Sequence, residues 1–81
     1  MYRIRVFNAW TPPEGAWVWD NYNLIMWTRD QEKAWKGSLK CAKDVASIWL
    51  WFHGDAKAHR IVLEPVDQNS PPVLFHGREQ T

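Results

Sequence analysis

The sequence predicts an α+β domain in which one helix packs on one face of a four- or five-stranded antiparallel sheet. Two observations support this fold class. Residues 38–49 have helical periodicity, and strand-like segments stand before and after them. The links between successive strand-like segments are short, which favours antiparallel pairing. A chain of 81 residues has room for one core, so we expect a single compact domain over 1–81, with 77–81 a frayed tail.

The predicted helix begins after Ser38, whose hydroxyl can accept a hydrogen bond from a free backbone N–H of the first turn. At about 100° per residue, its apolar side chains fall within a third of the circumference. This stripe comprises Leu39, Ala42, Val45, Ala46 and Trp49. Cys41 lies beside the stripe, and we expect it to be a small core residue.

The first half of the chain offers several strands. Residues 1–7 alternate, which places Arg3, Arg5 and Phe7 on one face of a strand and the apolar residues between them on the other. A short strand is expected over 16–19. The richly apolar segment 22–28 is predicted to be the central strand. Residues 29–33 are polar and predict a hairpin turn, after which 34–36 pair back and lead into the helix.

The second half supplies the remaining strands. Residues 50–52 are ambiguous between a last helical turn and an extended exit. Residues 58–66 alternate, with Arg60, Val62 and Glu64 on one side, and 73–76 return as a last strand. Seven tryptophans exceed what so small a core can hold, so we expect the uncovered sheet face to carry aromatic side chains. Such a face would also suit self-association into a homodimer.

The composition excludes several classes of protein. The sequence has no long apolar run, and its N-terminal residues lack the apolar block of a signal peptide. A single cysteine fits a reducing compartment, so we expect a cytoplasmic protein. A net charge of +1 gives no general argument for binding nucleic acid or membrane.

Positive charge is nevertheless concentrated in one segment. Five basic residues and two acidic ones lie between positions 29 and 43; the basic ones are Arg29, Lys33, Lys36, Lys40 and Lys43. Such a cluster is either a solvated face or an anion-binding surface. Trp35 lies within it and is either an aromatic anchor for a partner or a strand residue covering the helix end.

Catalytic chemistry is not indicated. The histidines and Cys41 lack the paired spacing of zinc sites, and the four isolated glycines form no phosphate-cradling loop. The acidic residues are not spaced for acid–base work. We therefore expect neither an enzyme nor a cofactor.

One motif resembles a known family. The pattern Ser38-Leu39-x-x-Ala42-Lys43-x-x-Ala46-Ser47, followed after four residues by Phe52-His53-Gly54, resembles a stretch of small type I-F anti-CRISPR proteins. Arg60-Ile61 also looks like a pair in that family. The resemblance covers about a quarter of the chain.

The resemblance implies a phage or mobile-element inhibitor acting in the cytoplasm of a bacterial host. Such an inhibitor docks through a basic helix face on the surveillance (Cascade) complex and blocks the channel where target DNA pairs with guide RNA. Lys43 matches the family's helix lysine. The family is basic where this chain has Asp44 and has lysine where it has Ile48, so a related complex of another subtype is an alternative target.

Three hypotheses follow. The first is this inhibitor, which touches Cascade protein subunits or guide RNA phosphates through Lys36, Lys40 and Lys43. The second is a small nucleic-acid-binding module that uses the same lysines and exposed tryptophans. The third is a structural or regulatory subunit that forms a homodimer through its aromatic sheet face.

Overall fold

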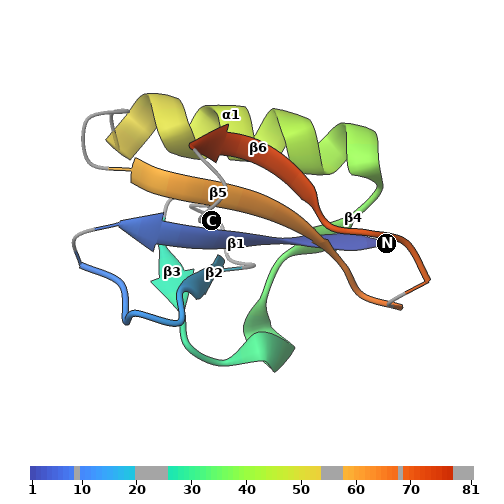
Figure 1. Ribbon diagram of the computed structural model, residues 1–81, viewed down its shortest axis with the longest axis horizontal. Coiled ribbons are helices and arrows are strands. Elements are labelled where there is room, and N and C mark those ends of the chain that lie inside the picture. Colours follow the sequence, from blue (N-terminus) through green and yellow to red (C-terminus); the bar gives the residue numbers. More distant parts are fainter. Residues whose placement is uncertain (9, 20–25, 54–57, 68, 78–81) are drawn as a thin grey trace.

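The computed structural model describes residues 1–8, 10–19, 26–53, 58–67 and 69–77. In these residues one α-helix lies along one face of an antiparallel sheet, as Figure 1 shows. The elements in chain order are β1 (Tyr2–Asn8), β2 (Ala16–Val18), β3 (Trp27–Thr28), the 3-10 helix η1 (Gln31–Lys33), β4 (Lys36–Gly37), α1 (Leu39–His53), β5 (Ala58–Pro65) and β6 (Val73–Gly77). The predicted α+β class is confirmed, with six strands in place of four or five.

Strand β1 is the centre of the sheet. The strand order is β3-β2-β1-β5-β6, and β4 pairs with the beginning of β1 on the side where β2 pairs farther along. The predicted central strand over 22–28 is therefore wrong for its described part. Trp27–Thr28 form an edge strand, Met26 is exposed, and residues 22–25 lie outside the described residues. An apolar run does not by itself fix a strand's place, because the place depends on which neighbours pair with it.

The helix begins as predicted. The backbone N–H of Cys41 donates to the Ser38 hydroxyl at 3.2 Å, so Ser38 is the N-cap. The helix continues through the ambiguous segment 50–52 and ends at His53, four residues beyond the predicted end. None of these added residues is a glycine or proline that would break the helix.

The core lies between α1 and the sheet. It joins the helix stripe to alternate residues of β1, β2 and β5, and Trp49 is its largest fully buried side chain. The members are Ile4, Val6, Val18, Ala42, Val45, Ala46, Trp49, Ile61 and Leu63, with Leu39 packed against them. Cys41 is exposed, contrary to the prediction, because it lies on the helix flank near the exposed Ile48.

The other sheet face carries the side chains that alternate with the core residues. Those of β1 are Arg3, Arg5 and Phe7, and those of β5 are Arg60, Val62 and Glu64, as the alternation predicted. Aromatic side chains do lie on this face, but charged groups separate them. Two of the most exposed tryptophans, Trp10 and Trp51, lie instead in a loop and on the helix.

Two smaller predictions are also resolved. The predicted turn over 29–33 contains η1, capped by Asp30, whose carboxylate accepts from the Glu32 backbone N–H at 3.0 Å. Of the predicted tail, Gly77 ends β6, and 78–81 lie outside the described residues. No helix among the described residues is long and apolar enough to cross a membrane.

Candidate functional site

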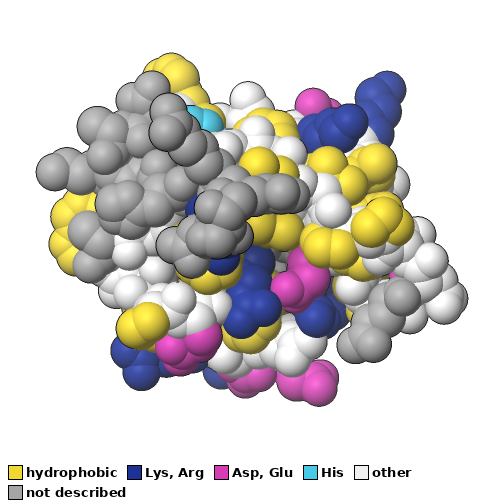
Figure 2. All heavy atoms as spheres, viewed as in Figure 1, with side chains coloured by type: hydrophobic (Ala, Val, Ile, Leu, Met, Phe, Trp, Pro, Cys, Tyr) yellow, Lys and Arg dark blue, Asp and Glu magenta, His cyan; other side chains and the backbone are white. Residues whose placement is uncertain are grey.

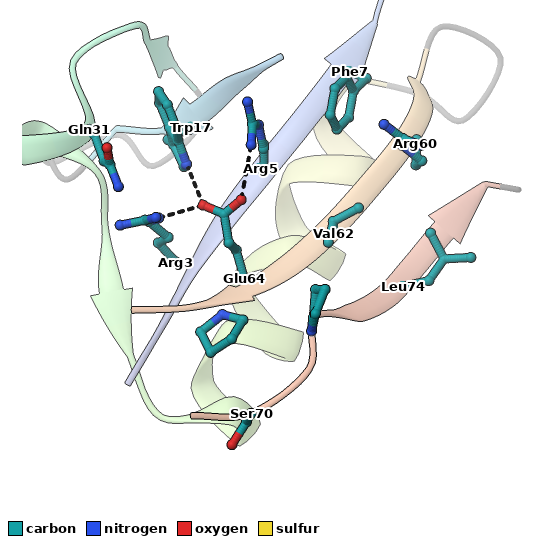
Figure 3. A pocket seen from close by; sticks show the side chains of 12 residues that line it. Arg3, Arg5, Phe7, Trp17, Gln31, Arg60, Val62, Glu64, Ser70 and Leu74 are labelled. Carbon is teal, nitrogen blue, oxygen red and sulfur yellow. Dashed lines mark hydrogen bonds and ion pairs between the residues drawn. The ribbon is translucent and has the colours of Figure 1, made fainter. Parts of the chain in front are cut away.

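The most elaborate polar arrangement on the described surface surrounds Glu64, on the sheet face opposite α1. Its carboxylate accepts from Arg3 Nε at 2.5 Å, from Arg5 Nη1 at 3.1 Å and from Trp17 Nε1 at 3.1 Å (Figure 3). The sheet register creates this meeting, because Arg3 is the direct cross-strand partner of Glu64, and Arg5 that of Trp17. Directly opposed residues place their side chains on the same face, within reach of one another.

The electrostatics of the cluster favour the ionised carboxylate. Burial of Glu64 by itself raises its pKa, but the hydrogen bonds from Arg3, Trp17 and Arg5, together with the Arg3 charge, outweigh burial and lower the pKa below its usual 4.5. The side chains of Arg3, Arg5 and Glu64 are 12%, 30% and 19% exposed. The ion pairs are therefore shielded from water more than ordinary surface pairs.

The two arginines of β1 differ in how many of their guanidinium nitrogens have hydrogen-bond partners. Arg3 gives its Nε to Glu64, and its two terminal nitrogens face the side-chain amide of Gln31 from η1, whose oxygen accepts from both in the amide orientation that satisfies it. Arg5 donates from Nε to the Glu14 backbone carbonyl at 2.9 Å, and its guanidinium lies over the Trp17 ring at 5.1 Å. Arg5 shares only Nη1 with Glu64, so its other terminal nitrogen has no protein partner among the described residues.

Of the three arginines on this face, Arg60 has the fewest polar partners among the described residues. Its guanidinium lies over the Phe7 ring at 4.1 Å, and no described carboxylate is within ion-pairing distance of it. Phe7 stands between Arg5 and Arg60 in Figure 3, and its ring is 5.8 Å from the Arg5 guanidinium. A Cβ on Gly15 would lie 2.7 Å from the Phe7 ring, so the glycine leaves the space that the ring fills.

These side chains line an open depression of about 770 Å³. Its lining combines the charged groups with the two aromatic rings and with apolar residues of β5, β6 and the turn between them, including Val62, Pro72 and Leu74. Three arginines against one glutamate leave the depression with two positive charges in excess. Figure 2 shows basic and acidic side chains next to one another near the middle of the face in view, bordered by hydrophobic ones.

The residues that the sequence singled out do not form one surface. Lys40 and Lys43 are exposed on α1, and neither has a carboxylate within ion-pairing distance among the described residues. Lys36 is half-buried in β4 and donates from Nζ to the Ala34 carbonyl at 3.3 Å. Arg29 and Lys33 are exposed around η1, which lies away from α1 on the other side of the strands in Figure 1.

Trp35 lies just before β4, at the side of Gly37. It is half-buried, packs against the core, and its ring leaves no room for a side chain at Gly37, where a Cβ would lie 2.5 Å from the ring. Trp51 is the more accessible ring, because its exposed fraction is 82%.

Sequence reasoning missed the depression, although its parts were visible. The alternation placed Arg3 and Arg5 on one face of their strand and Arg60 and Glu64 on one face of theirs. It gave no signal that these two strands pair, or in which register, and the pairing is what brings Glu64 opposite Arg3.

The described residues contain no group of three or more histidine, cysteine or acidic residues placed to hold a metal ion. Of the candidates considered from the sequence, His76 is half-buried on β6, and the side chains of His53 and His59 lie outside the described part. No protein-family model, no curated protein and no solved structure matches this chain.

Proposed function

We propose that this chain is a non-enzymatic binding protein that inhibits a type I CRISPR surveillance complex in the bacterial cytoplasm. In this proposal the outward face of α1 docks on Cascade protein subunits and prevents target DNA from pairing with the guide RNA. The observation that carries the proposal is the state of Lys40 and Lys43, which are exposed and free of carboxylate partners among the described residues. The resemblance of residues 38–54 to type I-F inhibitors supplies the partner.

Lys40 and Lys43 can meet a partner because the packing of α1 on the sheet does not involve them. Trp49 and the rest of the apolar stripe attach α1 to the sheet from the other side of the helix. An exposed lysine adds little to stability, so its charge is free to meet a partner. Carboxylates of the subunits, or phosphates of the guide RNA, are the groups that two such ammonium ions would meet in a channel built to hold nucleic acid.

The two residues that depart from the family pattern, Asp44 and Ile48, lie on the same outward face of α1 as the two lysines. At about 100° per residue, Asp44, Ile48 and Trp51 fall on the outward side with Lys40, and all three are exposed. The contact surface is therefore mixed in charge and contains apolar groups. Trp51 replaces Trp35 as the aromatic anchor in the proposal, since aromatic side chains dominate many interfaces.

A binding experiment with a matched control tests the proposal. Purified Cascade complexes of several type I subtypes would be captured with the tagged protein, and target DNA binding by each complex would then be measured. We expect one subtype to be captured and its DNA binding to be blocked.

The double variant Lys40→Glu/Lys43→Glu should abolish capture, because it reverses both charges on the helix face. The variant Arg29→Glu/Lys33→Glu makes the same change of charge near η1 and should leave capture intact. Capture of the Lys40→Glu/Lys43→Glu protein at the wild-type level, or capture of no subtype, would contradict the proposal.

A further inference from the structure

We infer that the depression on the open sheet face binds single-stranded nucleic acid, with Arg5 and Arg60 holding phosphates on either side of Phe7. This activity is separate from the inhibition proposed above, because it uses the sheet face opposite α1. It needs no CRISPR complex as partner. The site is formed by residues of β1, β2, β5 and β6, of η1 and of the turn between β5 and β6, which the sequence alone did not bring together.

The first step is that the depression attracts anions. Its lining has three guanidinium groups and one carboxylate, and that carboxylate already accepts from Arg3, Arg5 and Trp17. Glu64 therefore neutralises mainly Arg3, whose remaining nitrogens are taken by Gln31. The positive charge that no carboxylate compensates lies at Arg60 and at the remaining terminal nitrogen of Arg5.

The second step concerns the chemistry of the anion. The Arg60 guanidinium presents parallel N–H groups that match two oxygens of a phosphate, whereas Arg5 offers its remaining terminal nitrogen. Arg5 and Arg60 flank Phe7, at 5.8 Å and 4.1 Å from its ring. Two separate cation positions fit consecutive phosphates of one backbone better than they fit a single small ion.

The third step is that the lining of the depression suits a nucleic acid better than an acidic peptide. The depression is lined by the half-buried rings of Phe7 and Trp17 and by apolar side chains such as Val62 and Leu74. Bases and sugars can pack on the apolar side chains and stack on the guanidinium groups that lie over the two rings, since every base has an aromatic face, whereas aspartate and glutamate side chains have none. The charged and apolar parts of the lining therefore match the two parts of a nucleotide.

The fourth step favours a single strand. The Arg5 side chain is only 30% exposed and is held against Trp17 and Glu64, so it does not reach out from the surface. The phosphates of a rigid duplex would have to enter the depression together with their paired bases. A flexible single strand can lay its backbone and unpaired bases into it.

Fluorescence anisotropy with a labelled oligothymidylate of about twelve nucleotides tests the inference. We expect saturable binding at low salt that weakens about sevenfold between 50 and 200 mM salt, as two phosphate contacts on a single strand predict. Arg60→Gln should weaken binding severalfold and reduce the salt dependence to about 2.6-fold over the same range.

Matched variants test whether a loss of binding is specific to the Arg60 guanidinium. Arg29→Gln removes one exposed positive charge that does not line the depression and should leave oligonucleotide binding unchanged. Lys43→Gln removes one from the helix face and shows whether that face holds the oligonucleotide instead. Arg60→Lys keeps the charge but loses the paired N–H geometry, so it should bind between wild type and Arg60→Gln. Circular dichroism checks that each variant is folded, and Arg60→Lys decides the question if Arg60→Gln does not fold.

Three results would overturn the inference. One is the absence of oligonucleotide binding at a protein concentration of about 100 µM, the weak end of non-specific affinity. Another is a loss of binding in Lys43→Gln that equals the loss in Arg60→Gln, which would assign the phosphates to the helix. The third is tighter binding of a labelled oligoglutamate peptide than of the oligonucleotide, which would make the site one for acidic proteins.

Discussion

The two positively charged surfaces of this protein, the outward face of α1 and the open face of the sheet, hold their charges in different ways. On the helix, Lys40 and Lys43 extend into solvent without carboxylate partners among the described residues. On the sheet, Arg3 and Arg5 are fixed by Glu64 and lie against the Trp17 ring. The first surface presents separate, exposed ammonium groups, and the second is a preorganised group of planar donors.

The difference predicts how each surface is coupled to the fold. A charge without an ion-pair partner can be changed with little effect on stability, so its replacement is expected to affect binding alone. A charge held by a buried or half-buried partner contributes to stability as well, and its loss leaves that partner unsatisfied. The four predictions below test this distinction, beginning with the contact that attaches the helix surface to the sheet.

The largest effect is expected for the tryptophans of α1. Trp49 is fully buried, and Trp51, two residues later, is 82% exposed. Trp49→Ala should lower the free energy of unfolding by about 3–5 kcal/mol, because it leaves a cavity in a small core. Trp51→Ala should change it by less than about 0.5 kcal/mol. Urea denaturation of both variants measures the difference, and equal losses would show that the helix is not attached in this orientation.

The next effect is expected at the centre of the sheet cluster. Glu64→Gln removes the charge that holds Arg3 and Arg5, and should destabilise the protein by about 1–2 kcal/mol. Glu32→Gln makes the same chemical change at an exposed residue of η1 without a described salt bridge, and should be nearly neutral. If both variants unfold at the same urea concentration, the ion pairs of Glu64 add nothing to stability.

The same carboxylate predicts a dependence on pH. The pKa of Glu64 is lowered in the folded protein, so its contribution to stability is fully present above the usual value of 4.5. That contribution is lost as the pH falls through the lower folded value, because the unfolded chain takes up the proton first. The difference in unfolding free energy between wild type and Glu64→Gln should therefore shrink on acidification from pH about 7 to about 3. A difference that stays constant or grows would contradict the lowered pKa.

The smallest effect is expected on the helix face. Lys40→Glu/Lys43→Glu should shift the free energy of unfolding by less than about 0.5 kcal/mol, since neither lysine has a described ion pair to lose. Thermal unfolding followed by circular dichroism measures this. A large loss of stability would remove the contrast between the two surfaces, and would mean that the capture experiment reports unfolding rather than docking.

Local patterns predicted much of this architecture, and particular residues show why. The helix over 38–49, its Ser38 cap and its buried stripe follow from side-chain spacing and capping, which depend on neighbours in the sequence. The same holds for the two faces of β1 and β5. The prediction of a central strand failed for the described residues 26–28 because apolar content does not reveal strand order, and Cys41 was misplaced because it lies at the border of the stripe.

The sequence by itself determined which side chains share a face of each helix or strand, because that depends only on the period of the local backbone. The tertiary structure alone decided that β1 lies between β2 and β5, and that Arg3 faces Glu64 while Arg5 faces Trp17. Residues 61 positions apart meet there. Pairing of distant strands depends on the packing of the whole core, which no local period encodes.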